Sequence, residues 1–321
     1  MRSLSIGIVT PTTARSRQGN GYTASRWARM LRELGQRVMI GTDYDGVSRR
    51  GAPDLLIVLH ARRSAPHARA FLDAHPSRPL VVVLTGTDLY RDLPDNRAAR
   101  TTLDQASAVV ALQSAALDRL GPWRDKVHVI VQSVTTPTSM PTPRTRTVDA
   151  CVVGHLRTVK DPLRPAIAAR GLPACSRIAV LQVGRALEAT WRDRALAEME
   201  RNRRYHWLGE QPRWKARQLI ARSRMMILPS LMEGGAHVVA EAVVAGTPVL
   251  ATRIDGTVGQ LGEGYPGYFE VEDTAALTEL MGRVEMDARF VRELERWGRR
   301  CAPAFAPQRE LAGLRRLLRA L

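Results

Sequence analysis

Residues 225–251 of the chain read MMILPSLMEGGAHVVAEAVVAGTPVLA. The apolar run at 225–228 predicts a short buried strand, and a second run at 248–251 predicts another. Between them, a pair of glycines precedes an apolar segment at 236–245 that predicts a helix. A strand, a helix and a further strand in this order indicate a parallel sheet whose strands are buried on both faces.

The same alternation continues from this stretch in both directions. The C-terminal half has further predicted strands at residues 150–153, 177–183 and 205–208, and further predicted helices at 162–170, 191–201 and 212–222. The N-terminal half has predicted strands at residues 4–10, 37–42, 54–60, 79–84 and 127–131 and a predicted helix at 21–34. Residues 132–148 are rich in Ser, Thr and Pro and lack periodicity, which is typical of a linker.

These elements predict an α/β protein with two Rossmann-like, doubly wound domains, residues 1–140 and residues 141–305. Residues 306–321 contain an amphipathic basic helix that we expect to pack back on the N-terminal domain. Ligands in open α/β sheets bind beyond the carboxyl ends of the strands. We therefore expect the functional site in a cleft between the two domains.

Composition and cysteine usage favour a cytoplasmic globular protein. The chain has 321 residues, of which 45% are hydrophobic and 25% charged. No apolar run approaches the roughly 20 residues of a transmembrane helix, and the N-terminus is too short and strand-like for a secretion signal. Cys151, Cys175 and Cys301 are odd in number and far apart, which favours reduced thiols over a disulfide framework or a metal site.

The net charge of +17 raises the question of nucleic-acid binding. Only Lys126, Lys160 and Lys215 are lysines, and the other 45 basic residues are arginines scattered along the chain without interleaved aromatics. We therefore expect a solvated basic surface that suits small anionic substrates. We expect neither nucleic-acid binding nor stable membrane association, and the sequence leaves the oligomeric state open.

Two motifs match sites of other enzymes but lie in the wrong context. Residues 19–24 match G-x-G-x-x-A, yet eight residues separate them from the first predicted strand, where a dinucleotide-binding turn tolerates almost none. An NAD-dependent oxidoreductase is therefore a minor alternative. Asp43 and Asp45 match D-x-D, but Gly46 follows them, and this favours a polar turn over a metal site.

The glycines of the first motif keep a second possible role. Gly19, Asn20 and Gly21 lie where a loop leads into a predicted helix. Such a loop presents backbone N–H groups and the positive end of the helix dipole. A phosphate or carboxylate site and a plain flexible loop are both compatible with it.

Two cations stand between a strand and a helix in the second half. The segment GHLRTVKDP at 154–162 follows a predicted strand and precedes a predicted helix. Arg157 and Lys160 lie three residues apart, and Pro162 is placed to begin the helix. Both cations are therefore positioned to neutralise a diphosphate leaving group.

Two glutamates lie eight residues apart in the opening stretch. Glu233 stands at the turn after the strand, and Glu241 lies two turns into the helix. Gly234, Gly235 and Ala236 place small side chains and backbone N–H donors at the start of that helix, which suits phosphate. Glu241 is placed to accept hydrogen bonds from ribose hydroxyls, and Glu233 to contact a sugar.

Together these motifs resemble the retaining glycosyltransferases of the GT-B fold that are marked by E-x7-E, most sharply over residues 153–262. The resemblance implies a nucleoside-diphosphate-sugar donor bound mainly by the C-terminal domain, with no cofactor and no essential metal. It implies catalytic roles for Arg157, Lys160 and Glu233. The donor site that it implies comprises Gly154, Arg157, Lys160, Glu233, Gly234, Gly235, Ala236 and Glu241.

Two segments of the N-terminal half indicate which class of acceptor the protein uses. They are LHARRS at 59–64 and LTGTDLYRD at 84–92, and each follows a predicted strand. With residues 19–21 they resemble the selenosugar synthase branch of this family, which acts in selenoneine biosynthesis. That branch joins a UDP-sugar, typically UDP-N-acetylglucosamine, to selenophosphate and forms a carbon–selenium bond. The acceptor site implied by the resemblance comprises Gly19, Asn20, Gly21, His60, Arg62, Arg63, Thr85, Thr87 and Asp88.

The residue types in these two segments of the N-terminal half suit an anionic acceptor. Thr85 stands where many relatives with hydroxyl acceptors carry a histidine, so a general base is not expected there. Selenophosphate is already anionic and its selenium is a soft nucleophile, so its site needs cations and backbone donors. The candidate cations are Arg62, Arg63 and Arg91.

Two neighbouring groups have other expected roles. Asp88 is expected to orient the loop, because a carboxylate would repel an anionic acceptor, whereas His60 fits either packing or ligand contact. The alternative functions are a glycosyltransferase with a hydroxyl acceptor, either glycan or lipid, and a nucleotide-sugar epimerase of the same fold. The sequence does not distinguish glucose from N-acetylglucosamine as the transferred sugar.

Overall fold

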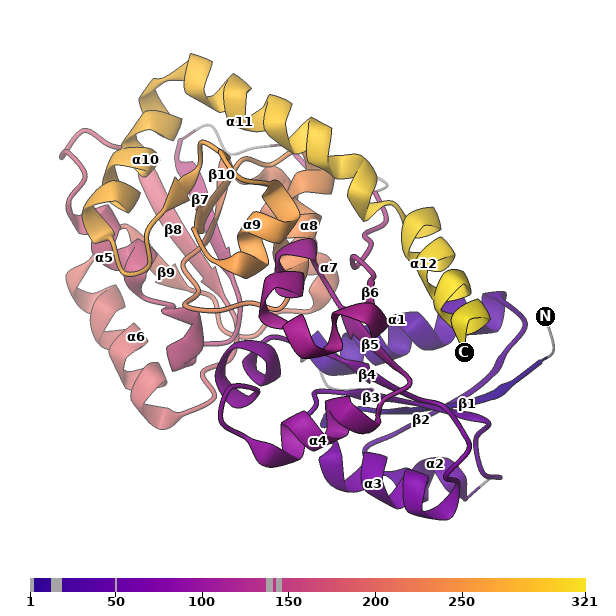
Figure 1. Cartoon of the computed structure of the whole chain (residues 1–321). Coiled ribbons are helices and arrows are strands. Elements are labelled where there is room, and N and C mark those ends of the chain that lie inside the picture. Colours follow the sequence, from indigo (N-terminus) through magenta and orange to yellow (C-terminus); the bar gives the residue numbers. More distant parts are fainter. Residues whose placement is uncertain (1–2, 13–18, 50, 137–140, 143–145) are drawn as a thin grey trace. The chain divides into compact units, whose positions relative to one another are not determined.

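The computed structural model describes residues 3–12, 19–49, 51–136, 141–142 and 146–321 (Figure 1). The chain divides into two units, one formed by Met1–Ser133 together with Ala306–Leu321 and the other by Val134–Phe305. The first unit therefore consists of two segments that are far apart in the sequence. Its main segment ends at Ser133, whereas the sequence placed the boundary at residue 140.

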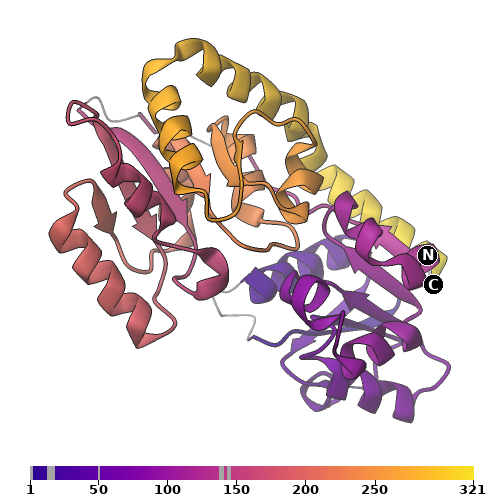
Figure 2. The same cartoon turned by 60° about the vertical axis from the view of Figure 1, so that its left-hand side comes forward.

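The first unit is a parallel sheet with helices on both faces (Figure 2). In the described part of the chain the strand order is β2-β1-β3-β4-β5-β6. The strands are β1 (Ser5–Val9), β2 (Arg37–Gly41), β3 (Leu55–Leu59), β4 (Leu80–Val83), β5 (Ala108–Ala111) and β6 (Val127–Val129). The helices are α1 (Gly19–Glu33), α2 (Tyr44–Ser48), α3 (Ala65–Ala74), α4 (Arg97–Gln105) and α12 (Pro307–Ala320), with short helices η1 (Asp88–Asp92), η2 (Ser114–Arg119) and η3 (Gly121–Lys126).

Strand β3 shows why a continuous apolar run forms the centre of this sheet. Leu55 and Ile57 belong to the core cluster that includes residues of α1 and α12. Leu56 and Val58 belong to the cluster on the other face, which includes Phe71 of α3 and residues of α4. Successive side chains of a strand point to opposite faces, so both faces must be covered for the whole run to be buried.

The sequence prediction missed one central strand. Strand β5 pairs in parallel with β4 and with β6, yet it was absent from the predicted set. Its four residues are small and apolar, Ala108–Ala111, and they show no period that separates a strand from a buried helix segment. The strand predicted at 127–131 ends two residues earlier than expected, at Val129.

The second unit repeats the architecture with its own sheet. In the described residues the strand order is β12-β11-β10-β7-β8-β9, and each pairing is parallel. The strands are β7 (Val148–Val153), β8 (Ile178–Val183), β9 (Tyr205–Trp207), β10 (Met225–Leu228), β11 (Val249–Thr252) and β12 (Tyr268–Phe269). The helices are α5 (Arg164–Arg170), α6 (Ala189–Arg201), α7 (Arg213–Arg222), α8 (His237–Ala245), α9 (Asp255–Leu261), α10 (Thr274–Met286) and α11 (Ala288–Cys301), with short helices η4 (Thr158–Lys160) and η5 (Ala302–Phe305).

A glycine sets the length of α8 and the start of β11. Gly246 has a φ of 75°, in the left-handed region that side chains other than glycine rarely adopt. This conformation lets the next residue, Thr247, donate its N–H to Ala242 O at 2.9 Å and so end the helix. Pro248 follows and cannot continue the helix. Val249 then begins β11, which pairs with β10.

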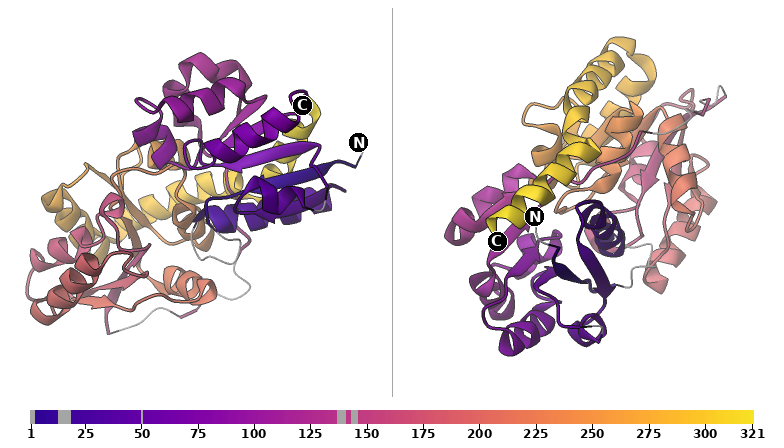
Figure 3. Two further views of the ribbon diagram at one scale, coloured as in Figure 1. Left: turned by 90° about the horizontal axis from the view of Figure 1, so that it is seen from below. Right: turned by 90° about the vertical axis from the view of Figure 1, so that its right-hand side faces the viewer.

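Helix α12 returns to the first unit and lies along α1 (Figure 3). The contact centres on Glu310, whose side chain is fully buried. Arg26 of α1 donates Nε to Glu310 Oε2 at 3.0 Å and Nη2 to Oε1 at 2.9 Å. Trp27 Nε1 donates to Oε1 at 2.7 Å, and Ser133 donates its N–H and its hydroxyl to Oε2 at 2.8 and 2.6 Å. One carboxylate thus joins both segments of the unit at the point where the chain leaves it.

The Glu310→Gln variant tests this anchor. The amide keeps the size of the side chain but removes its charge, which leaves Arg26 buried without a counter-ion. A broken buried pair costs about 3–5 kcal/mol, so we expect a loss of that order in the free energy of unfolding measured with urea.

The matched control is Glu33→Gln in α1. Glu33 lies 3.9 Å from Arg29, and both side chains are more than half exposed. Exposed pairs of this kind contribute about 0–1 kcal/mol. Equal losses in the two variants would contradict the anchoring role of Glu310.

Candidate active site

In the second unit, parallel pairing of β7 with β10 brings the loops after both strands to one edge of the sheet. Leu231 donates its N–H to Val159 O at 2.9 Å, which ties the two loops together. Lys160 donates Nζ to Glu233 Oε1, and Ser230 donates its hydroxyl to the same oxygen at 2.7 Å. The structure therefore brings the predicted residues Lys160 and Glu233 into direct contact.

Two glycines allow the loops of this edge to approach closely. A Cβ at Gly256, in the first turn of α9, would lie 2.1 Å from Glu233 O. A Cβ at Gly184, just after β8, would lie 1.9 Å from Gly154 O. Cβ atoms do not come this close to a carbonyl oxygen in folded proteins, so both positions require glycine. The backbone of Gly154 thus packs directly against Gly184, and that of Glu233 against Gly256.

Glu241 lies in α8 with only 7% of its surface exposed. Arg213, at the start of α7, donates Nη2 to Glu241 Oε1 at 2.5 Å, and His237 Nδ1 lies 3.4 Å from the same oxygen. Burial by itself raises the pKa of Glu241, but its contacts with His237 and the charge of Arg213 outweigh that effect and hold the pKa below its usual value. Glu241 is therefore a buried but ionised carboxylate.

Arg213 was missed by the sequence analysis. It follows a loop and opens an ordinary-looking helix, and its partner Glu241 is far away in the sequence. Helices α4 and α5 also begin with an arginine, at Arg97 and Arg164, so the position of Arg213 at a helix start gave no signal of its own.

Two predictions about helix starts in this region were wrong. Helix α5 begins at Arg164 rather than at Pro162. Asp161 adopts a left-handed φ of 39° and accepts a hydrogen bond from Arg164 Nε at 2.7 Å, which places Pro162 in a turn before the helix. Gly154, Arg157 and Lys160 nevertheless lie in the predicted loop, with Arg157 immediately before η4.

The second error concerns Ala236, which was expected to offer its backbone N–H to phosphate. Helix α8 begins at His237, and the Ala236 N–H donates to Gln260 Oε1 at 2.9 Å. Gln260 Nε2 in turn donates to Ala236 O at 3.2 Å. The N–H of Ala236 is therefore used within the protein, while Gly234 and Gly235 lie in the turn before the helix.

In the first unit, the loops after β3 and β4 carry the residues expected to bind the acceptor. Asp88 is fully buried and accepts hydrogen bonds from the N–H groups of Ala61, Thr85 and Gly86, at 3.0, 2.8 and 2.9 Å. Thr85 also directs its hydroxyl to Asp88 Oδ1, at 3.3 Å. The carboxylate therefore orients both loops, which is the role that the charge argument predicted.

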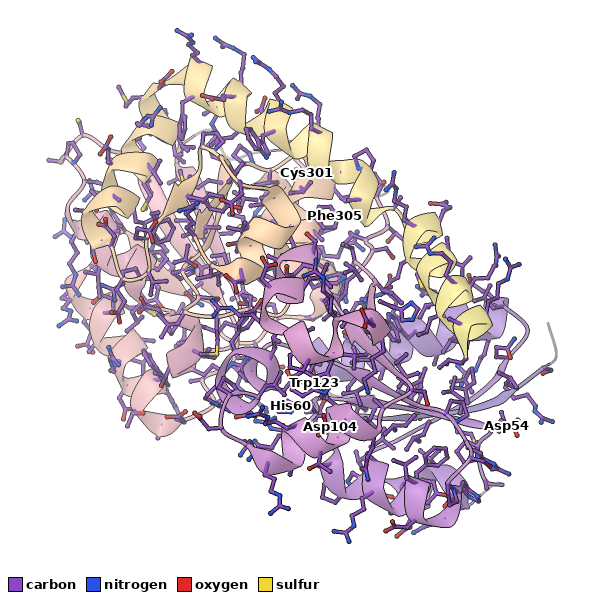
Figure 4. All side chains as sticks on the ribbon, viewed as in Figure 1. Asp54, His60, Asp104, Trp123, Cys301 and Phe305 are labelled. Carbon is purple, nitrogen blue, oxygen red and sulfur yellow. The ribbon has the colours of Figure 1, made fainter. Side chains whose placement is uncertain are left out.

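His60 follows β3 in the first unit (Figure 4). It is 2% exposed. Its φ of 74° is strained for a residue other than glycine. The N–H of Arg63 donates to His60 Nδ1 at 3.3 Å, so the ring proton lies on Nε2, which donates to Thr87 Oγ1 at 3.1 Å. Burial lowers the pKa of His60, and the charge of Asp88 offsets only part of this effect. The imidazole is therefore neutral near pH 7.

Asp92 lies beside His60 and was not among the expected site residues. Its side chain is 6% exposed, and His60 Nε2 lies 3.8 Å from its Oδ2. Arg62 donates Nε to Oδ2 at 2.8 Å, and Arg91 donates Nε to Oδ1 at 3.1 Å. Arg63 contributes its backbone to the cluster, and its side chain is exposed. The motif LTGTDLYRD ends on Asp92, but a charged residue near a helix end gave no sign of burial.

The glycine motif at the start of α1 lies inside the helix rather than in a loop before it. Gly19 and Gly21 belong to the first turn, and Gly21 is buried. Thr23 and Ser25 donate their hydroxyls to Gly19 O and Gly21 O at 3.1 and 2.9 Å. Most of the residues between β1 and this helix, 13–18, lie outside the described residues.

The structure also shows the environment of Asp43 and the state of the three cysteines. Asp43 caps α2 by accepting a hydrogen bond from the Gly46 N–H at 2.6 Å, so its D-x-D motif is a polar turn. In the described residues, no group of three or more His, Cys, Asp or Glu side chains is placed to hold a metal ion. No helix in the described part of the chain has the length and apolar character needed to cross a membrane. Cys151, Cys175 and Cys301 are free thiols.

Comparison with known proteins places the geometry in context. Residues 143–300 match the family model described as glycosyl transferases group 1. The structure of Anabaena HepE in complex with UDP and glucose is similar over 99% of this chain and 100% of its own, with a TM-score of 0.77 and 16% identity. The sucrose-phosphate synthase of Thermosynechococcus elongatus is similar over 99% of this chain and 98% of its own, with a TM-score of 0.78 and 14% identity.

A glycosyltransferase of Rickettsia africae is similar over 100% of this chain and 99% of its own, with a TM-score of 0.76 and 15% identity. No curated protein matches the sequence. The structural matches span both units and show the predicted arrangement of two Rossmann-like parallel sheets, the GT-B fold.

The Gly256→Ala variant tests the close packing behind Glu233. The added Cβ would overlap Glu233 O, so the Glu233 loop must shift and the contact with Lys160 weakens. We expect a fall of about 10²-fold in kcat/KM for a reaction at this site, since misplacement of site residues by about 1 Å costs that much.

Gly298→Ala in α11 is the control, because a Cβ there meets nothing within 4 Å. It should keep full activity and a slightly raised midpoint of thermal unfolding. Equal activity of the two variants would contradict the requirement for glycine at 256.

Proposed function

We propose that this chain, which has the GT-B fold and whose residues 143–300 match the family model of group 1 glycosyl transferases, is a glycosyltransferase that joins the sugar of a UDP-sugar to selenophosphate. The product carries a new carbon–selenium bond at the anomeric carbon. The proposal has two parts, a donor bound by the second unit and an acceptor bound by the first. Separate observations support each part.

The donor is a UDP-sugar, which we propose to be UDP-N-acetylglucosamine. The similar Anabaena HepE has been solved with UDP and with UDP-glucose, which supports UDP as the nucleotide. In this chain, Lys160 in the loop after β7 donates a hydrogen bond to Glu233 in the loop after β10. Arg157 lies in the same loop as Lys160. These cations can take up the charge that develops on the departing diphosphate. The buried, ionised Glu241 suits the ribose hydroxyls, because a carboxylate accepts hydrogen bonds only.

Asp88, Asp92 and His60, with the arginines around them, form a cluster after β3 and β4 in the first unit. The acceptor assignment depends on one observation, that these acidic and imidazole groups already make hydrogen bonds within the protein. Asp88 accepts three backbone N–H groups, and Asp92 accepts from two arginines. His60 carries its proton on Nε2 and accepts at Nδ1. A sugar or lipid hydroxyl gains from a positioned base when it attacks, whereas selenophosphate has no proton to lose from its attacking atom. The cluster therefore favours an anionic acceptor.

The proposed reaction needs no proton transfer. A selenium lone pair forms the bond to the anomeric carbon while the bond from that carbon to the UDP oxygen breaks. UDP leaves with the electron pair, and Lys160 and Arg157 stabilise it. We propose that these side chains make a metal ion unnecessary, so the same turnover is expected with and without EDTA.

The decisive experiment measures UDP release from UDP-N-acetylglucosamine with and without selenophosphate, followed by mass spectrometry for the selenium isotope pattern. Release that depends on selenophosphate, with a sugar product containing selenium, is the expected result. Release that depends on an alcohol acceptor instead, or that yields an epimerised sugar without any acceptor, would overturn the acceptor assignment. UDP-glucose in parallel determines the sugar preference.

The Lys160→Ala and Arg157→Ala variants test the leaving-group role. Loss of a preorganised donor to a developing charge typically lowers kcat by about 10²–10³-fold, so we expect a fall of that order in each variant. Lys215→Ala is the control, since Lys215 lies over the exposed Trp214 in α7. Near-normal turnover in both site variants would rule out the proposed role.

A further inference from the structure

We propose that Arg62 and Arg91, held in place by the buried Asp92, form a binding site for a tetrahedral oxyanion in the first unit. Asp92 is a positioning residue in this site, and the two guanidinium groups are the ligand contacts. The identification of the anion as the phosphoryl group of selenophosphate rests on the proposed function. The anion site itself rests on the geometry of the cluster.

The geometry joins two cations that are distant in the sequence. Arg62 follows β3 and Arg91 lies in η1, yet each donates its Nε to a different oxygen of Asp92. Asp92 is 6% exposed, whereas the side chains of Arg62 and Arg91 are 41% and 52% exposed. Among the described residues, the hydrogen bonds of both guanidinium groups to side chains use only Nε. The terminal nitrogens therefore remain for a ligand at the protein surface.

The charges of the cluster favour an anion. Two arginines meet the carboxylate of Asp92, and the exposed Arg63, adjacent in sequence to Arg62, brings the cations to three against two buried acids. The second buried acid, Asp88, is satisfied by backbone N–H groups. His60 contributes no positive charge because burial lowers its pKa. Arginine suits phosphoryl groups because its planar fork of N–H donors matches two oxygens at once.

The hydroxyl of Thr87, which lies near His60 Nε2 as Asp92 does, can complete the site. His60 Nε2 lies 3.1 Å from Thr87 Oγ1 and 3.8 Å from Asp92 Oδ2. Because the His60 Nε2–H donates to Thr87, the Thr87 hydroxyl can direct its own proton to a ligand oxygen. Thr87 Oγ1 and Asp92 Oδ2 thus lie beside the same imidazole nitrogen, and the Thr87 hydroxyl is the third ligand contact of the proposed site.

The test measures binding of thiophosphate, a stable analogue of selenophosphate, to the full-length protein by calorimetry, with UDP as a second ligand. Asp92→Asn keeps the size of the side chain but removes the charge that holds the arginines together. Arg91→Gln removes one ligand contact at a half-exposed position, where the fold should tolerate the change. Each variant should weaken thiophosphate binding about 10- to 100-fold, the worth of a charge-assisted hydrogen bond, and leave UDP affinity unchanged.

Asp73→Asn is the matched control. Asp73 lies 3.7 Å from Arg69 on α3, and both side chains are more than 70% exposed. This variant should bind thiophosphate like the wild type. In the turnover assay, Asp92→Asn should raise the KM for selenophosphate and leave the KM for the UDP-sugar unchanged, which a merely destabilised protein would not show. Asp92→Glu should restore part of the affinity.

Failure of this inference and failure of the proposed function give different results. Unchanged thiophosphate affinity in both Asp92→Asn and Arg91→Gln, or no binding by the wild type, would overturn the anion site even if a selenosugar forms. Thiophosphate binding that both variants lose supports the anion site. If selenophosphate then fails to accelerate UDP release, the site stands and the assignment of its anion is overturned.

Discussion

The buried carboxylate of Glu310 is the interaction on which the first unit depends. Its partners Arg26 and Trp27 lie in α1, and Ser133 is the last residue of the main segment. The apolar residues of α12, Leu314 and Leu317, complete the core on that face of the sheet. Ionic and apolar contacts thus join at one helix, and the ionic contact fixes its register because a shifted helix would leave Arg26 buried and uncompensated.

A common principle operates at the ends of the strands in both units. An acid with little exposed surface is neutralised by nearby donors, and its cationic partners are thereby fixed in position. Asp92 does this for Arg62 and Arg91 in the first unit, and Glu233 does it for Lys160 in the second. Each acid would be costly to bury alone. Paired, it converts flexible cationic side chains into positioned ones before any substrate arrives.

The sequence predicted the fold well where an apolar run consists of large side chains, as at residues 225–228, which form β10 with those bounds. It failed where the deciding interaction was distant. The N–H of Ala236 donates to Gln260, and Glu241 pairs with Arg213. In both pairs the two residues are more than 20 positions apart in the sequence. Asp92 was overlooked because burial of a charged side chain follows from the loops around it. Local patterns therefore identified the loops of the site but not how their side chains are paired.

The division of the first unit into two segments has a consequence for protein synthesis. The ribosome synthesises the main segment of the first unit, then the whole of Val134–Phe305, and only afterwards α12. At typical rates of elongation, the second unit takes roughly ten to thirty seconds to emerge. During that time the face that includes Ile6 and Trp27 lacks its covering helix, and Arg26 lacks its counter-ion. The first unit therefore completes its core only after the whole of the second unit has been synthesised.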